Sequence, residues 1–310
     1  MKILLLGANG YLGRHAARAL RALPGAELYT AGRRPPHDLT LDLAAGQMPA
    51  LMADLAALAP DAVVNCAGAV SGSALNLAEA NARGPALLSD AMLAAAPQAR
   101  LVHLGSAAEY GATEMGVALT ERSPVAPVGV YGATKLAGSL AVAGSRLEEA
   151  VVLRVFNPVG PGAPAQSLPG RLAGELRRVG PQGRIRVGDL SAYRDFVDVR
   201  DLAEAVALAV TAPRPLPRVL NLGSGSARPV RELVRALTGA AGFRGELVEE
   251  AAAGSERSAV VPWQRADVGA AAEHLGWRPV TPLERSLADL WESTAAEGAR
   301  DGAERPAVAR

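Results

Sequence analysis

The sequence predicts an α/β fold in which a doubly wound parallel sheet is followed by a smaller α/β lobe toward the C-terminus. An apolar run at 3–6 leads into a glycine-rich turn at 7–13 and then into a helical stretch. Short apolar strands then alternate with helical stretches as far as residue 165, where the rhythm changes. We expect a sheet domain at 1–165, with segments around 195–225 returning to it, a lobe at 166–292 and a flexible tail at 293–310.

Length and composition describe an ordinary globular protein. The chain has 310 residues, enough for a large domain and a smaller lobe. It is 49% hydrophobic and 20% charged, with a net charge of +1, so neither nucleic acid nor an anionic membrane is an expected partner. Cys66 is the single cysteine, which excludes an intrachain disulfide and a cysteine-based metal cluster. We expect a cytoplasmic protein without metal, because 3–6 is also too short for a signal peptide.

The glycine-rich turn at 7–13 carries the first functional signal. It joins a strand to the helical stretch 14–23 with the spacing G-x-x-G-x-x-G. Glycines in this position let backbone N–H groups and the helix N-terminus approach a diphosphate. A turn without a ligand is the alternative. The residues predicted to bind a dinucleotide here are Gly7, Gly10, Tyr11, Leu12 and Gly13.

The second strand, at 27–31, predicts which dinucleotide binds. Arg33 stands twenty residues beyond Gly13, with Arg34 beside it. An acidic residue at about this position binds the adenosine ribose of NAD, whereas arginine accommodates the 2′-phosphate of NADP. We therefore favour NADP(H) over NAD(H), the alternative being a solvated arginine pair. Asp42 and Leu43 follow at a position suited to the adenine edge.

Two later stretches are expected at the same site. The strand 62–68 ends in small residues, so a cofactor can approach the backbone near Ala67. The helix predicted at 76–94 contains Asn81, close to Gly84 and a proline. A kinked or open helical turn there would expose backbone groups that bind water.

Ser106 follows the buried strand 100–105, at the end where ligands lie in open parallel sheets. His103, inside that strand, is expected to pack in the core. A loop containing Pro124 and Pro127 then leads to a helix that begins near Tyr131.

Tyr131 and Lys135 are four residues apart, so on a helix both side chains lie on one face. A nearby cation stabilises a phenolate and lowers a tyrosine pKa from its usual value of about 10. Alone, this spacing is also typical of an ordinary surface helix. With Ser106 at a neighbouring strand end, it predicts a proton-transfer centre.

The C-terminal half is less regular. A sixth strand at 150–156 precedes a segment at 157–162 that we expect to be irregular, because it contains two prolines and two glycines. Helices are predicted at 167–179, 202–211 and 230–237, a short strand at 184–187, and a strand with a turn at 219–225. The segment 196–201 leads into the helix at 202.

Together these motifs resemble the extended short-chain dehydrogenase/reductase family, the NAD-dependent epimerases, dehydratases and reductases of nucleotide sugars. The resemblance runs from Lys2 to Trp291, nearly the whole chain. It rests on the glycine turn, Ser106 before Tyr110-Gly111, Tyr131 with Lys135, Arg154-Val-Phe-Asn157 with Gly160-Pro161, Arg194 to Asp201, Asn221-Leu-Gly-Ser-Gly225 and Leu275-Gly-Trp-Arg-Pro279.

The resemblance implies a Rossmann-type NAD(P)-binding domain, a substrate-binding lobe and four catalytic residues. Tyr131 would exchange a proton with the substrate oxygen, and Lys135 would tune the tyrosine and bind the nicotinamide ribose. Ser106 would bind the reacting oxygen, and Asn81 would hold a relay water. Asn157 is implied at both cofactor and substrate.

Arg194 would bind the nucleotide diphosphate through its guanidinium, unless it forms an ion pair with Asp195 or Asp198. Arg257 is a second candidate for this contact. The resemblance also allows a homodimer, in which the stretches 76–94 and 135–147 form a four-helix interface, although burial against the sheet explains the same pattern.

Two observations predict the subclass of enzyme within this family: a missing pair of acidic residues and the sequence of one segment. Dehydratases of the family carry an Asp-Glu pair where this chain has Ala107 and Ala108. Segment 188–201 looks most like that of the GDP-4-dehydro-6-deoxy-mannose reductases. We therefore expect NADP(H)-dependent reduction of a keto group, at C4, of a nucleotide-linked sugar. The alternatives are an NAD-dependent nucleotide-sugar 4-epimerase, a ketoreductase of a non-sugar metabolite and a non-catalytic dinucleotide sensor.

Overall fold

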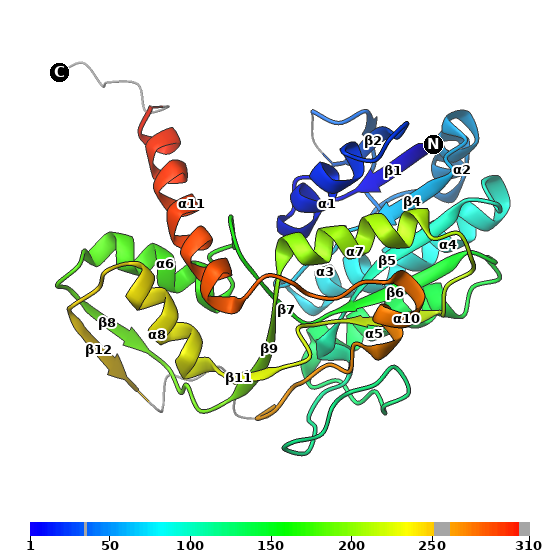
Figure 1. The fold of residues 1–310 in the computed structure, drawn as a ribbon. Helices are drawn as coiled ribbons and strands as arrows, with labels where there is room; N and C mark the ends of the chain where they lie inside the picture. The colour runs from blue at the N-terminus through cyan, green and yellow to red at the C-terminus, as the bar shows by residue number, and fades with distance from the viewer. Residues whose placement is uncertain (34–35, 251–260, 304–310) are drawn as a thin grey trace.

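The computed structural model describes residues 1–33, 36–250 and 261–303. A seven-stranded sheet forms one half of the molecule, and a lobe of smaller sheets and helices forms the other (Figure 1). All neighbouring strands of the large sheet are parallel, which confirms the predicted doubly wound fold. The spatial order is β10 (Val219–Leu222), β6 (Ala150–Val155), β5 (Arg100–Ser106), β4 (Ala62–Asn65), β1 (Lys2–Leu6), β2 (Glu27–Gly32) and β3 (Leu39–Thr40).

Helices cover both faces of this sheet because successive strand residues point to opposite sides. In β1, Ile3 and Leu5 pack with one set of helices, and Leu4 and Leu6 pack with the other. The first set is α1 (Tyr11–Arg21), α7 (Val199–Thr211) and α10 (Gly269–Leu275). The second set is α2 (Met48–Leu58), α4 (Gly84–Ala95) and α5 (Gly129–Ala143).

The helix predicted at 76–94 is divided into three pieces. α3 (Ala74–Ala78), capped by the Ser73 side chain, passes into a π-helix, η1 (Glu79–Arg83), and then into α4. This wider turn contains Asn81, in agreement with the open helical turn predicted there. π-Turns of this kind are frequent at functional sites.

The lobe contains two small sheets. One has the order β11 (Ala227–Pro229), β9 (Tyr193–Asp198), β7 (Asn157–Val159), and the other pairs β8 (Arg184–Val187) with β12 (Glu246–Glu249). Apolar side chains of α6 (Leu168–Val179), α8 (Val230–Ala240) and α11 (Leu283–Ala303) pack together with these sheets.

Two local predictions were wrong. Residues 157–159 are not irregular but form β7, which pairs in parallel with β9. Pro158 is tolerated because β7 is an edge strand, where a missing N–H costs no ladder bond. The segment from 293 is not a frayed tail as far as Ala303, because α11 continues through it. Its alanines, its glutamate and its arginine are good helix formers. Residues 304–310 lie outside the described part.

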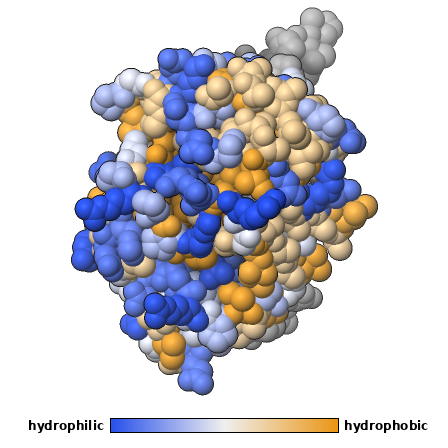
Figure 2. Space-filling model, turned by 90° about the vertical axis from the view of Figure 1, so that its right-hand side faces the viewer, coloured by the Kyte–Doolittle hydropathy of each residue, from blue (hydrophilic) through white to orange (hydrophobic). Residues whose placement is uncertain are grey.

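The surface is mixed in character. Seen from the side of the large sheet, hydrophilic residues form a broad band across the molecule and apolar residues gather in separate patches beside it (Figure 2). Leu75 of α3 and Leu140 of α5 are exposed large apolar residues, and the homodimer expected through these helices stays a prediction. Within the described ranges, no helix is both long and apolar enough to cross a bilayer.

Candidate active site

The turn after β1 leaves no room for side chains at its glycines. Gly7 has φ +79°, and a Cβ there would lie 2.7 Å from the Ala67 nitrogen. A Cβ on Gly13 would lie 2.0 Å from the Gly7 carbonyl oxygen. Gly10 caps α1 without a side-chain hydrogen bond, and the first turn of α1 holds no acidic residue. The N–H groups there are therefore suited to an anion, so these residues fit a dinucleotide diphosphate.

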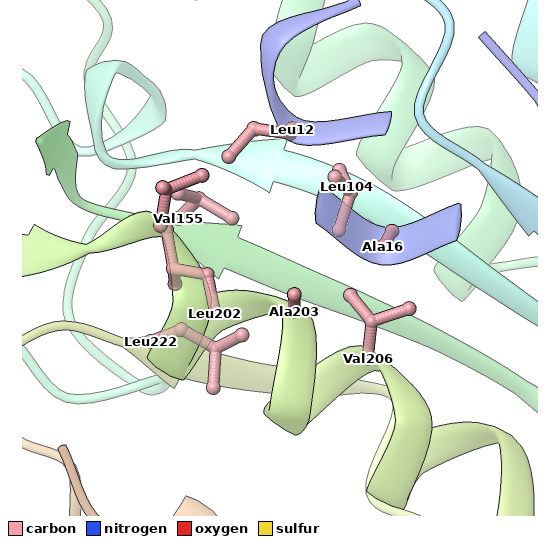
Figure 3. A pocket seen from close by; sticks show the side chains of 9 residues that line it. Leu12, Ala16, Leu104, Val155, Leu202, Ala203, Val206 and Leu222 are labelled. Atoms are coloured by element: carbon pink, nitrogen blue, oxygen red, sulfur yellow. The ribbon is translucent and has the colours of Figure 1, made fainter. Parts of the chain in front are cut away.

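The neighbouring side chains of the turn point elsewhere. The Tyr11 hydroxyl donates to the Gly160 carbonyl at 3.2 Å, and burial raises the pKa of this phenol. Leu12 lines a small apolar cavity between α1, α7 and the sheet (Figure 3). That cavity is part of the hydrophobic core and carries no polar group for chemistry. Neither side chain is therefore placed for a cofactor, and the cofactor roles of Tyr11 and Leu12, which would have to come from their backbone, stay predictions.

At the end of β2, several polar side chains form a row of hydrogen bonds that the sequence did not predict. The His37 ring lies against Gly32, where an added Cβ would come within 2.2 Å of Nε2. His37 contacts Asn9 of the glycine turn at 3.2 Å and Thr30 at 3.3 Å. The Thr30 hydroxyl donates to Asp38 at 2.9 Å.

Arg33 is exposed and follows Gly32, next to these hydrogen-bonded side chains. Arg34 lies outside the described residues. The predicted 2′-phosphate position thus holds His37 and Asp38 as well as an arginine. Local spacing could not show this, because His37 reaches Gly32 by folding back over the strand end.

The predicted adenine contacts lie near the start of α4. The Asp42 carboxylate accepts a hydrogen bond from the Ala44 nitrogen at 3.0 Å. Leu43 is buried and lies against Gly84, where a Cβ would come 3.2 Å from the Leu43 Cβ. The Ala67 nitrogen donates to the Asn65 side chain at 3.0 Å. These contacts fix the backbone after β3 and after β4, and the cofactor roles stay predictions.

Ser106 ends β5 and starts the short 3₁₀ helix η2 (Ala107–Glu109). Its hydroxyl accepts from the Ala108 nitrogen at 3.2 Å, and its own nitrogen donates to Glu109 Oε1 at 2.7 Å. This is a capping box, which holds both the backbone and the hydroxyl of the serine in place.

The first turn of α5 packs directly on η2. A Cβ on Gly132 would lie 2.6 Å from the Ala108 carbonyl oxygen, so the helix carrying Tyr131 touches the turn that carries Ser106. One turn later, Lys135 is buried, and its Nζ donates to the Leu104 carbonyl at 2.6 Å. Burial lowers the pKa of Lys135. The structure thus brings Ser106, Tyr131 and Lys135 to the carboxyl end of one strand.

Asn81 joins this group through its side chain. Its amide exchanges two 2.8 Å hydrogen bonds with the backbone of Ala69 and also donates to the Thr134 hydroxyl at 3.3 Å. Thr134 in turn donates to the Tyr131 carbonyl at 3.0 Å. The side chain therefore ties the loop after β4 to the helix of the tyrosine. Any relay water would need the backbone of η1, and that role stays a prediction.

The predicted substrate contacts lie across β7 and β9. The Asn157 amide donates to the Asp195 carbonyl at 2.9 Å. Arg194 is buried, and its Nη1 donates to the Tyr193 carbonyl at 2.7 Å. The carboxylates weighed as its ion-pair partners have other contacts: Asp195 binds Ser224, Gly225 and Ala266, and Asp198 binds Arg200 and Ser286. Arg257 lies outside the described residues.

Below the serine lies a buried polar network that sequence reasoning missed. Glu109 forms a 2.7 Å ion pair with Arg154, whose guanidinium lies 4.7 Å from the Tyr110 ring centre. The Tyr110 hydroxyl donates to Asn221 at 2.7 Å. A signal was present, because Ser106-Ala-Ala-Glu109 has the spacing of a capping box.

Fold and site together define a class. A doubly wound sheet with a glycine cradle, and with serine, tyrosine and lysine gathered beside it, belongs to the extended short-chain dehydrogenases/reductases. Comparison with known proteins gives the family: residues 3–223 match the model of the NAD dependent epimerase/dehydratase family. The chain belongs to that family and is an NAD(P)-dependent enzyme.

Relatives of nearly equal length act on nucleotide sugars by name. The chain is 38% identical to dTDP-6-deoxy-L-talose 4-dehydrogenase (NAD(P)(+)) of Kitasatospora kifunensis, over 95% of this chain and 96% of that one. It is 28% identical to GDP-6-deoxy-D-mannose reductase of Pseudomonas aeruginosa, over 96% and 99%. The solved structure of MoeE5 with UDP-glucose and NAD has a TM-score of 0.82 at 28% identity, covering 96% and 99%.

Proposed function

We propose that this protein reduces a keto group, at C4, of a nucleotide-linked sugar with NADP(H). The observation that carries the proposal is the assembly of Ser106, Tyr131 and Lys135 by direct packing of α5 on η2. The positions after the serine are Ala107 and Ala108, both buried, so the acidic pair expected of a dehydratase is missing at these two positions. The site is equipped for one proton transfer, which is what carbonyl reduction or alcohol oxidation needs.

Each residue then has a separate task. The Ser106 hydroxyl binds the carbonyl oxygen and stabilises the negative charge that develops there. Tyr131 gives its proton to that oxygen, and the charge of Lys135 favours the phenolate that remains. The glycine turn and the N-terminus of α1 hold the cofactor diphosphate. The bound cofactor supplies the hydride, and the protein orients and shields the reacting groups.

The preference for NADP(H) over NAD(H) rests on Arg33, exposed at the end of β2 where the 2′-phosphate is expected. A guanidinium binds a phosphate dianion by charge-assisted hydrogen bonds. Asp38 near the same strand end opposes this preference, but its carboxylate faces the Thr30 nitrogen and hydroxyl. The Kitasatospora kifunensis relative is named for both cofactors.

A 4-epimerase is the second candidate, because the matched family includes epimerases and the same three residues serve that reaction. An epimerase keeps its nicotinamide cofactor bound and shows no net oxidation. Tightly bound NAD after purification, together with no consumption of NADPH on any keto sugar, would establish the epimerase and exclude the reductase.

The decisive experiment is a screen of NADPH oxidation against a panel of 4-keto nucleotide sugars, with NADH in parallel. We expect turnover on at least one 4-keto sugar, faster with NADPH, and turnover lower by about 10²-fold or more with the Tyr131→Phe variant. Turnover on a non-sugar ketone that survives Arg194→Ala, without binding of nucleotide diphosphates, would identify a non-sugar ketoreductase. Cofactor binding without turnover on any substrate would identify a dinucleotide sensor.

A further inference from the structure

Glu109 is a fully buried acidic residue directly beneath the catalytic candidates. Acidic side chains are almost never fully buried unless they are paired. Its Oε1 accepts from the Ser106 nitrogen at 2.7 Å and from the Ser139 hydroxyl at 2.8 Å. Its Oε2 accepts from Arg154 Nε at 2.7 Å. Three donors, one of them cationic, therefore hold this side chain in a defined orientation.

The carboxylate is close enough to Lys135 for its charge to act against burial and raise the pKa of the lysine. Ser139 and Lys135 are four residues apart in α5 and so share one helix face. Ser139 contacts Glu109 from that face, and Lys135 contacts Leu104, two residues before Ser106. Gly105, between Leu104 and Ser106, leaves room for the carboxylate, since a Cβ there would lie 2.8 Å from Glu109 Oε1 and 3.1 Å from the Ser139 hydroxyl oxygen.

The other titratable groups that face Lys135 are uncharged at neutral pH. Burial raises the pKa of the Cys66 thiol on β4 to about 12. Burial and the charge of Lys135 hold the pKa of His103 on β5 well below its usual range. Arg154 is cationic but binds the far oxygen of Glu109. Among the described groups packed around this lysine, apart from Tyr131 itself, Glu109 therefore supplies the negative charge.

We propose that Glu109 is a positioning residue of the active site: it anchors the Ser106 turn through the Ser106 nitrogen, and its charge keeps Lys135 protonated. A buried lysine tends to lose its proton, and a neutral amine would no longer favour the phenolate form of Tyr131. The inference rests on the proposed roles of Ser106, Tyr131 and Lys135. It adds a charged residue that acts through them without touching substrate.

The chain offers an unusually direct test, because it contains only two lysines, Lys2 and Lys135. Protein labelled with ¹³C at lysine Cε gives two signals to titrate by NMR, and Lys135→Arg assigns them. Replacing Glu109 by Gln removes the stabilising charge, so the Lys135 midpoint falls by about one pH unit or more. Lys2, whose Nζ contacts the Leu58 carbonyl at the opposite end of the sheet, is an internal reference and does not move.

Three further variants separate charge from packing. Glu149→Gln breaks the Arg100 ion pair at the other end of β5 and leaves the Lys135 midpoint unchanged. Ser139→Ala removes one neutral hydrogen bond to Glu109 and also leaves it unchanged. If Glu109→Gln does not fold because Arg154 is left unpaired, the double variant Glu109→Gln/Arg154→Gln removes both charges. In that variant the Lys135 midpoint still falls.

An unchanged Lys135 midpoint in a folded Glu109 variant overturns the proposal. Because the titration needs no substrate, it stands or fails separately from the proposed reaction. Once a substrate is known, Glu109→Gln lowers kcat and moves the alkaline limb of the kcat profile to lower pH, with unchanged NADPH affinity. Loss of kcat without any shift of that limb would leave only a structural role for Glu109.

Discussion

The glycine turn at 7–13 and the segment 194–201 are both motifs shared with the family, yet they work in opposite ways. In the turn, side chains are excluded and the N–H groups at the start of α1 have no side-chain cap. In the segment, every aspartate is engaged within the protein: Asp195 by Ser224, Gly225 and Ala266, Asp198 by Arg200 and Ser286, and Asp201 by Val280 and Thr281. The glycine turn is suited to a ligand, whereas the three aspartates of the segment join parts of the fold.

The segment 194–201 also explains a further shared motif, the segment 275–279. The Trp277 indole donates to the Asp201 carbonyl at 2.8 Å, so the segment 275–279 and the start of α7 form one joint. Asp195 shows the cost of such a joint, because burial raises its pKa to about 6 although four hydrogen bonds favour the ionised form. A recurring motif therefore identifies a constraint, and only the contacts show whether a ligand or the chain itself imposes it.

The largest expected effect is at the proton donor. Tyr131→Phe should lower kcat by about 10²-fold or more, the usual scale for removing a general acid, while NADPH affinity stays the same. Steady-state kinetics and cofactor fluorescence titration measure the two quantities. Tyr29→Phe, which removes a hydroxyl bonded to Glu27, is the matched control and leaves kcat unchanged. Full turnover in Tyr131→Phe would remove the tyrosine from the mechanism.

The joint in the C-terminal half predicts a stability effect without a catalytic one. Asp201 is buried and accepts bonds from the Val280 nitrogen and from the nitrogen and hydroxyl of Thr281. Asp201→Ala should lower the free energy of unfolding by about 3 kcal/mol, because buried donors lose a charged acceptor. The kcat of the folded fraction stays within about twofold, since the site is untouched.

Urea unfolding measures the Asp201 effect. Asp189→Ala is the control: this half-buried carboxylate bonds only to the nearby Ser191 among the described contacts, and its loss costs at most about 0.5 kcal/mol. If Asp201→Ala instead abolished turnover in a stably folded protein, the motif would belong to the active site.

The comparison also explains what the sequence could predict. The turn at 7–13, the serine at a strand end and the Tyr131–Lys135 pair follow from local spacing, because strand, turn and helix positions determine where they point. The open turn at Asn81 follows similarly from Gly84 and Pro85. These features need no knowledge of distant partners.

The features that the sequence did not predict all depend on contacts with residues far away in the sequence. Residues 157–159 form a strand only because β9 lies beside them. Helix α11 continues past 293, where the Arg177 guanidinium lies 3.5 Å from the Trp291 ring centre and Ser293 accepts a bond from Gly162. Glu109 meets Arg154 from a strand 45 residues later. Local propensity cannot show such pairings, because tertiary contacts decide them.

A pair of alanine substitutions tests whether the turn is closed to side chains. Gly13→Ala should weaken NADPH binding by about tenfold and lower stability by about 1–3 kcal/mol, since the new Cβ meets the Gly7 carbonyl 2.0 Å away. Gly174→Ala is the matched control, because its Cβ meets nothing within 4 Å on helix α6. That substitution should raise stability by about 0.5–1 kcal/mol. If both substitutions had equal effects on NADPH binding and stability, the turn at 7–13 would not be closed to side chains.

The smallest effect concerns the choice of cofactor. Arg33→Ser should raise the KM for NADPH by about fivefold and leave that for NADH unchanged, because an exposed ion pair contributes about 1 kcal/mol. Arg18→Ser, at the exposed end of α1, is the control for loss of a positive charge and changes neither KM. Raising the salt concentration should narrow the difference between the parent and Arg33→Ser, because counterions screen exposed charges. A parallel rise in both KM values would show that Arg33 holds a part common to the two cofactors, so that His37 and Asp38, rather than the arginine, face the 2′ position.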